Sequence, residues 1–268
     1  MSDIHQLRSH LLGLGRVVLG YSGGVDSALL AVVGTTLGPN RFLAVTGRSA
    51  SYPEAQARSA LELARRFEIP LIQIDTHELN DPRYLENSTE RCYFCKSELW
   101  SRLGAIARER SFDTVIDGTN ADDLGEHRPG LRAAAEQMVR SPLAELGWCK
   151  ADVRAAARDL GIPVWDTPAS PCLSSRVLYG LTITPDRLRQ VEAGEAYLRQ
   201  LGITGDLRVR HHGDTARLEV ARDQMDLIRA NWPAVDHTFS DLGFAAVELD
   251  PEGYRRGGLL ALAPHSPR

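Results

Sequence analysis

The sequence predicts an α/β protein in which a mainly parallel sheet is covered by helices on both faces and is followed by a small α+β unit. Up to about residue 165, short apolar runs alternate with amphipathic stretches. Such alternation with short connections is typical of parallel sheets. A segment rich in proline and serine follows, and beyond it the pattern changes. We therefore expect two domains, residues 1–168 and 169–268.

The elements follow from hydrophobic periodicity. The first domain has short, apolar, often β-branched runs that predict strands at 17–21, 42–46, 70–75 and 114–117. Helical spacing of apolar residues predicts helices at 26–37, 53–68, 96–110 and 150–160. In the second domain we expect a helix over 185–201, strands at 207–212 and 216–220, a helix near 222–230 and a final strand at 244–250.

Composition narrows the class of protein. Charged residues make up 25% and hydrophobic ones 43%, as in ordinary globular proteins. The net charge of −4 argues against a dedicated nucleic-acid binder. The N-terminus lacks an apolar core of signal-peptide length, and no window approaches about 18 apolar residues. We expect a cytoplasmic protein with no membrane or nucleic-acid partner, in which four cysteines are thiols or ligands rather than disulfides.

The stretch "YSGGVDS" at 21–27 lies between an apolar run and a helical stretch. Glycines let backbone N–H groups turn towards a ligand, and a helix N-terminus adds partial positive charge, so this loop suits phosphate. It lacks the lysine of a Walker A loop. A plain strand-to-helix turn is the alternative, but it explains one glycine better than the whole motif.

"SGGVDS" resembles the PP-loop of the ATP pyrophosphatases, whose domain is adenine nucleotide alpha hydrolase-like. These enzymes cut ATP between its α- and β-phosphates and transfer AMP. The resemblance implies that the loop holds pyrophosphate and that Asp26 serves Mg²⁺. The implied loop residues are Ser22, Gly23, Gly24, Val25, Asp26 and Ser27.

A second part of this site is expected after the fourth strand, at "DGTNADD" (117–123). There Gly118 lets the chain pass close to the nucleotide, and Asp122 can join Asp26 in placing Mg²⁺. A solvated acidic turn remains the alternative.

Four further segments together resemble the LarE family: "RCYFCKSELWSRL" (91–103), "DGTNADDLGEHRPGLRAAAE" (117–136), "SPCLSSRVLYG" (170–180) and "LRVRHHGDTARLEV" (207–220). LarE proteins adenylate the carboxylates of pyridinium-3,5-dicarboxylic acid mononucleotide and convert them to thiocarboxylates. The product becomes the nickel-pincer cofactor of lactate racemase. The resemblance thus implies an AMP-forming sulfur transferase. Because LarE relatives form homo-hexamers, it also implies a homo-oligomer.

The cysteines indicate the variant of the family. The sacrificial cysteine of some members lies one position before Cys172, where this chain has Pro171. Cys92, Cys95 and Cys172 instead match the variant whose three thiolates hold a 4Fe–4S cluster with one iron open to sulfide, supplied as such or by a sulfur-delivery protein. Half a zinc site or ordinary thiols remain alternatives. Cys149 has an apolar setting and is expected in the core.

Several arginines are candidates for anion binding. Arg176 can hold a phosphate or the substrate carboxylate. Arg208 and Arg210 are two apart in an expected strand, so they share a face and can clamp a phosphate, unless that face is simply solvated. Glu195 and Glu219 fall where the family has acids near a subunit interface that bind metal, but Leu227 occupies the slot of the third acid. We expect His211 and His212 to be structural, and Lys96 either to face the adenylate or to be solvated.

Two other hypotheses about the function stay open. The chain can be another PP-loop enzyme, either a tRNA thiolase or an amide-forming synthetase. A tRNA enzyme should be more basic, and an amidotransferase would need a glutaminase domain that does not fit in this length. It can also be a nucleotide-binding module without turnover. Mg²⁺-dependent AMP release separates an enzyme from such a module.

Overall fold

The computed structural model describes residues 3–125, 129–168 and 170–255, which divide into two compact units. The first unit takes the residues up to 49 together with 54–78 and 92–170, and the second takes 50–53, 79–91 and the residues from 171 onward. The expected boundary between 168 and 169 stays a prediction, and two short earlier segments group with the second unit. Residues 256–268, which end the expected second domain, lie outside the described residues.

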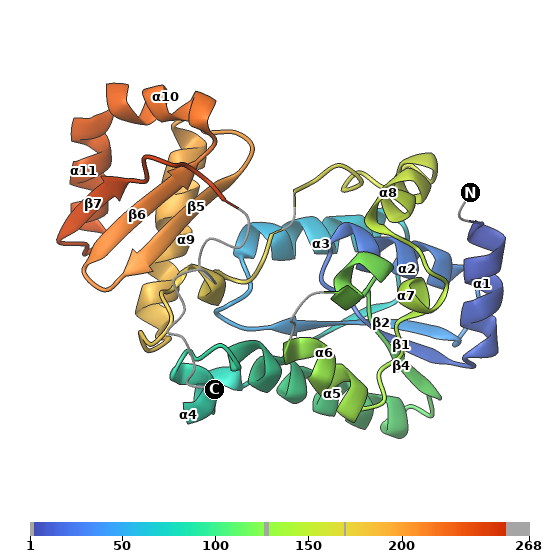
Figure 1. Ribbon diagram of the computed structural model, residues 1–268. Coiled ribbons are helices and arrows are strands. Elements are labelled where there is room, and N and C mark those ends of the chain that lie inside the picture. Colours follow the sequence, from blue (N-terminus) through green and yellow to red (C-terminus); the bar gives the residue numbers. More distant parts are fainter. Residues whose placement is uncertain (1–2, 126–128, 169, 256–268) are drawn as a thin grey trace. The chain divides into compact units, whose positions relative to one another are not determined.

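The first unit is built on a four-stranded parallel sheet with the order β3-β2-β1-β4 (Figure 1). In this register Leu19 of β1 lies opposite Ala44 of β2 and Ile116 of β4. This confirms the expected α/β fold class. The strands are β1 (Val17–Gly20), β2 (Phe42–Arg48), β3 (Leu71–Asp75) and β4 (Thr114–Ile116).

Helices cover both faces of this sheet, because alternate strand residues point to opposite sides. Val17 and Leu19 join a core with helices α1, α2, α3 and α8. Val18, from the other face, packs with α5 and α6, which lie across the sheet from α2 and α3 in Figure 1. The helices of this unit are α1 (Ile4–Gly13), α2 (Val25–Thr35), α3 (Glu54–Arg66), α5 (Arg91–Glu109), α6 (Pro129–Glu136), α7 (Pro142–Glu145) and α8 (Lys150–Asp159).

The second unit contains a three-stranded mixed sheet with its own apolar core. Strand β6 pairs antiparallel with β5 and parallel with β7, and buried residues of α9, α10 and α11 complete the core. The elements are α4 (Pro82–Leu85), α9 (Pro185–Gln200), β5 (Leu207–His212), β6 (Thr215–Val220), α10 (Met225–Ala230), α11 (Trp232–Asp241) and β7 (Ala246–Leu249). This agrees with the expected small α+β unit.

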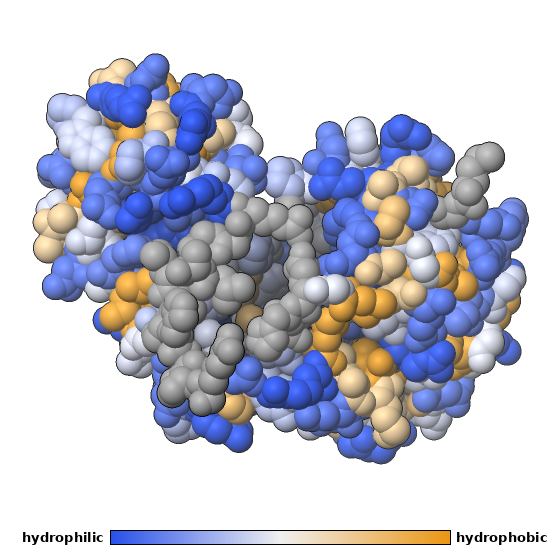
Figure 2. Space-filling model, in the orientation of Figure 1, coloured by the Kyte–Doolittle hydropathy of each residue, from blue (hydrophilic) through white to orange (hydrophobic). Residues whose placement is uncertain are grey.

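Hydrophilic residues cover most of the visible surface of each unit in Figure 2. Among the described residues, no helix is long and apolar enough to cross a membrane.

Candidate functional site

The PP-loop lies where β1 ends and α2 begins. Gly23 has a φ of +71°, and a Cβ there would lie 2.5 Å from the Cβ of Ala60 on α3. Both facts require glycine, because other residues pay a steric penalty in this left-handed region. Gly24 is the N-cap of α2, so Val25, Asp26 and Ser27 form the first turn. The first N–H groups of a helix have no intrahelical acceptor and suit an anion.

Hydrogen bonds hold this loop in shape. The Ser27 hydroxyl donates to the Gly24 carbonyl (3.0 Å) and accepts from the Ser22 N–H (3.2 Å). From α3, the Gln56 amide donates to the Ser22 carbonyl (3.0 Å). Ser27 is buried while Ser22 is exposed. The loop is therefore shaped by the protein's own hydrogen bonds, and the part played by Gln56 could not be foreseen from the motif.

Asp26 is the charged centre of this site. Its Oδ1 accepts from the Asn120 side chain (3.0 Å), and its Oδ2 pairs with the Lys150 ammonium at 2.5 Å. The Lys150 main-chain N–H donates to Asp122 Oδ2 (2.8 Å). Asp26 and Asp122 were expected here from the sequence, whereas Asn120 and Lys150 were not.

The segment after β4 is shaped by its own side chains. Asp117 accepts hydrogen bonds from the Thr119 N–H (3.0 Å) and hydroxyl (2.8 Å) and from the Ser141 hydroxyl (2.8 Å). Asp123 accepts from the Asn120 N–H (3.1 Å). These contacts argue against a merely solvated acidic turn. Asp117 and Asp123 are thus engaged within the segment, whereas Asp122 is the acid of the motif that shares a partner, Lys150, with Asp26.

Gly118 lies against the first turn of α2. A Cβ on it would lie 3.0 Å from the Ser27 nitrogen and 3.2 Å from the Asp26 Cβ. The expected close approach is thus made to the PP-loop helix itself. A side chain at position 118 would separate the two halves of the site.

Two carboxylates suit Mg²⁺, which is commonly bound through one or two protein carboxylates together with substrate phosphates and water. Asp26 and Asp122 both contact Lys150, and this donor set fits that chemistry. In the described part of the chain no group of three or more His, Cys, Asp or Glu side chains is placed to hold a metal.

The cysteines fall on both units. Cys92 and Cys95 lie in the first turns of α5, which begins before the helix expected at 96–110, and Cys172 precedes a 3₁₀ turn, Leu173–Arg176, in the second unit. Cys92 is exposed, and Cys95 and Cys172 are half-buried. The three-thiolate set therefore stays a prediction.

Cys149 is not a core residue as expected, because it is half-buried and caps α8. Its N–H and thiol both lie within hydrogen-bonding distance of Asp152 Oδ2, at 3.0 and 2.9 Å. Its role is to hold the start of the helix that carries Lys150.

In the second unit the expected arginines are buried and form a charge cluster with buried Glu219 and half-buried Glu195. Arg176 pairs with Glu195 (2.9 Å), and Arg210 pairs with Glu219 (2.9 Å). All three arginines are less than a tenth exposed, so the strand face of Arg208 and Arg210 is not solvated. Burial and the nearby charge of Arg176 lower the pKa of Arg208.

Arg176 has further partners: it donates to the carbonyls of Pro171 and Cys172. Most of its donors are thus used within the protein, and its anion-binding role stays a prediction. His211 is buried, contacts Gln190 at 2.9 Å, and has its pKa lowered to about 4 by burial, which agrees with a structural role. The Lys96 ammonium lies 5.0 Å from the centre of the Trp100 ring.

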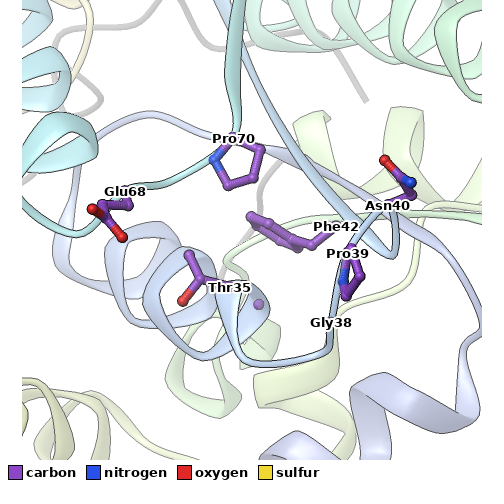
Figure 3. Close-up of a pocket in the computed structure, with 8 residues that line it drawn as sticks. Thr35, Gly38, Pro39, Asn40, Phe42, Glu68 and Pro70 are labelled. Atoms are coloured by element: carbon purple, nitrogen blue, oxygen red, sulfur yellow. The ribbon is translucent and has the colours of Figure 1, made fainter.

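One surface pocket lies away from this site (Figure 3). It is formed at the end of α2 and the start of β2, which is opposite to the end that carries the PP-loop. It is lined by Gly34, Thr35, Gly38, Pro39, Asn40, Phe42, Glu68 and Pro70. Its position separates it from the chemistry expected at the PP-loop.

Comparisons with known proteins show what this chain is similar to. A family model described as NAD synthase matches residues 6–110, which include the PP-loop. An uncharacterized protein of Synechocystis sp. is 41% identical over 260 residues, covering 96% of this chain and 97% of its own. An uncharacterized protein of Methanocaldococcus jannaschii is 31% identical over 242 residues, covering 90% of this chain and 91% of its own.

The informative relative is the pyridinium-3,5-bisthiocarboxylic acid mononucleotide synthase of Lactiplantibacillus plantarum. It is 36% identical over 248 residues, which cover 92% of this chain and 90% of the synthase. The shared region spans both units and every candidate site residue described above. This chain therefore belongs to the LarE family of ATP-dependent PP-loop enzymes.

Proposed function

We propose that this enzyme is an ATP-dependent sulfur transferase that makes thiocarboxylates from the carboxylates of pyridinium-3,5-dicarboxylic acid mononucleotide. Its product would serve the nickel-pincer cofactor of lactate racemase. The observation that carries the proposal is the 36% identity to the bisthiocarboxylic acid mononucleotide synthase over 92% of the chain. The PP-loop geometry between β1 and α2 supports the ATP half of the reaction.

In the first half-reaction a substrate carboxylate oxygen attacks the α-phosphorus of ATP. The bond from that phosphorus to the oxygen bridging to the β-phosphate breaks, so that pyrophosphate leaves and an acyl adenylate forms. The N–H groups at the start of α2 and the hydroxyls of Ser22 and Ser27 bind the pyrophosphate. Asp26 and Asp122 would hold Mg²⁺, which neutralises phosphate charge when bound.

In the second half-reaction sulfide attacks the acyl carbon, the bond from that carbon to the AMP oxygen breaks, and AMP leaves. Cys92, Cys95 and Cys172 would hold a 4Fe–4S cluster, which supplies the sulfide when bound. Thiolates are the usual protein ligands of such clusters, and Cys92 and Cys95 are close together on one helix.

Arg208 and Arg210 are the groups proposed to hold the phosphate of the mononucleotide, with Arg176 near the carboxylate. Their burial favours this role, because a charge removed from water binds an anion more strongly. We further propose that the enzyme works as a cytoplasmic homo-oligomer and receives sulfide as such or from a sulfur-delivery protein.

The test uses anaerobically purified, cluster-reconstituted protein with Mg·ATP, sulfide and the pyridinium dicarboxylate mononucleotide. Mass spectrometry follows the substrate, and chromatography separates AMP from ADP. We expect a thiocarboxylate product with AMP release and no loss of sulfur from the protein. AMP release only with another acceptor would retain the PP-loop chemistry and refute the substrate. No ATP cleavage would favour a binding module.

A cysteine variant tests the sulfur step separately. Cys172→Ala should abolish thiolation while AMP transfer to the substrate continues, because the PP-loop lies in the other unit. Cys149→Ser is the matched control, since serine is a good N-cap and should preserve α8 and full thiolation. Product formation by Cys172→Ala would show that the cluster assignment is wrong.

A further inference from the structure

Lys150 stands out among the basic residues of this chain. The sequence has 31 basic residues, and only two of them, Lys96 and Lys150, are lysines. Arginine and lysine differ physically: lysine is a compact, flexible point charge, whereas arginine presents a rigid planar fork. The residue that contacts Asp26 is therefore one of only two lysines in a chain whose other basic residues are arginines.

The pair that Lys150 forms is placed within the nucleotide site. Its ammonium lies 2.5 Å from Asp26 Oδ2, in the first turn of α2 directly after the glycines. The Lys150 side chain is 37% exposed and that of Asp26 is 19% exposed, so solvent and ligands can reach the pair.

The main chain of Lys150 is held by hydrogen bonds, whereas its side chain is partly exposed. Its main-chain N–H is held by Asp122, and the preceding Cys149 caps the same helix through Asp152. Asp26 is likewise held in place, since Asn120 donates to its other oxygen. If the ammonium leaves, the carboxylate keeps its orientation and one oxygen becomes available.

The proposed function places Mg²⁺ on that same carboxylate. A magnesium ion and an ammonium group cannot occupy the same lone-pair region of Asp26 Oδ2. If Mg·ATP binds with its ion on Asp26 Oδ2, the Lys150 ammonium would have to leave that oxygen, and the phosphate oxygens of the nucleotide would offer it new negative charge.

We propose that Lys150 is a ligand of the ATP phosphates, held on Asp26 before the nucleotide binds and transferred to phosphate when Mg²⁺ takes Asp26. This rests on the proposed function, because it requires the PP-loop to bind Mg·ATP. Lys150 would then balance charge on the phosphates as the bond between the α- and β-phosphates breaks.

If the pair of Lys150 with Asp26 is purely structural, removing Lys150 should change the affinity for Mg·nucleotide in the opposite direction. If Lys150 only neutralises Asp26, its removal leaves Asp26 more available to Mg²⁺, and Mg·nucleotide binds equally well or better. If Lys150 moves to phosphate, its removal deletes a charge-assisted hydrogen bond, and binding weakens. The direction of the change decides between the two.

The experiment measures binding of the α,β-methylene analogue of ATP, which cannot be cleaved at the relevant bond, by titration calorimetry. Lys150→Met should weaken binding about 10- to 100-fold in the presence of Mg²⁺. With EDTA in place of Mg²⁺ the difference from wild type should shrink, because Asp26 then retains Lys150. Lys150→Arg keeps the positive charge but not the shape of the side chain, so its affinity for the analogue should lie between those of wild type and Lys150→Met.

The matched control is Arg158→Met, which removes one positive charge from the same helix at an exposed position, where Arg158 pairs with its neighbour Asp159 at 3.2 Å. It should bind the analogue like wild type. Thermal unfolding of each variant checks that α8 is intact.

The binding results distinguish a failure of the Lys150 inference from a failure of the proposed sulfur transfer. Lys150→Met binding as tightly as wild type, or more tightly, overturns the inference and leaves the proposed sulfur transfer intact. A reduction that is the same with and without Mg²⁺ also overturns it, since the exchange on Asp26 would not occur. Wild-type protein that binds no analogue overturns the proposed function together with the inference.

Discussion

Gly23→Ala should damage the PP-loop for two separable reasons. The backbone at this position has a φ of +71°, and an alanine Cβ would lie 2.5 Å from the Cβ of Ala60. The left-handed conformation costs a residue with a Cβ about 1–2 kcal/mol. Overpacking of this kind costs about 1–3 kcal/mol. Together these predict a loss of about 2–5 kcal/mol from the free energy of unfolding.

Urea unfolding measures this loss, and a second substitution separates its parts. Ala60→Gly removes the methyl group that clashes and itself costs about 0.5–1 kcal/mol in a helix. The double variant should therefore recover the packing part, a coupling of about 1–3 kcal/mol, while the conformational part remains. Gly24→Ala is the control, because φ is −70° there and the nearest atom to an added Cβ is 3.5 Å away.

Two results would refute the proposed need for glycine at position 23. In one, Gly23→Ala unfolds at the same urea concentration as Gly24→Ala; in the other, adding Ala60→Gly to Gly23→Ala recovers no stability. The first result would mean that the loop relaxes without cost. The second would mean that the contact with α3 does not determine the need for glycine.

Two further predictions concern the second unit. Glu219→Gln should lower the free energy of unfolding, measured in urea, by about 3–5 kcal/mol, because it leaves the buried charge of Arg210 without its carboxylate. The control is Glu252→Gln, which breaks an exposed pair with Arg222 and should change the free energy of unfolding by less than about 1 kcal/mol. Equal effects of the two substitutions would contradict this explanation. Burial lowers the pKa of His211 from 6.5 to about 4, so the folded protein keeps this side chain neutral where the unfolded chain would protonate it. The resulting stabilisation is complete above about pH 6.5 and is lost as the pH falls towards 4. The loss amounts to about 3 kcal/mol at most. His211→Gln should flatten that part of the pH dependence of unfolding while the exposed His237→Gln does not, and identical slopes would contradict the assignment.

Much of the fold could be predicted from the sequence because the signals are local. Apolar β-branched runs marked all four strands of the first sheet, and the expected helix at 150–160 is found as α8. The helix at 91–109 begins earlier than expected, since its first turns carry polar residues and cysteines instead of an apolar stripe. The helices α1, α4, α6, α7 and α11 were missed, although the N-cap Asp3 and the early proline of α11 are start signals.

The candidate site was only partly predictable. Ser22, Gly23 and Asp26 were found because the PP-loop is a contiguous motif. Lys150 and Asn120 were missed because they reach Asp26 from positions far along the chain. The scarcity of lysine was the available signal for Lys150.

The sequence by itself determined the alternation of strands and helices, the phosphate-binding loop and the family resemblance, because each depends on neighbouring residues or on motifs. Only the tertiary structure decided the sheet order β3-β2-β1-β4, the pairing of Asp26 with Lys150, and the burial of Arg208 and Arg210 among glutamates. These features arise from contacts between residues distant in the chain. Hydrophobic periodicity describes which face of an element is buried, and it carries no information about which partner covers that face.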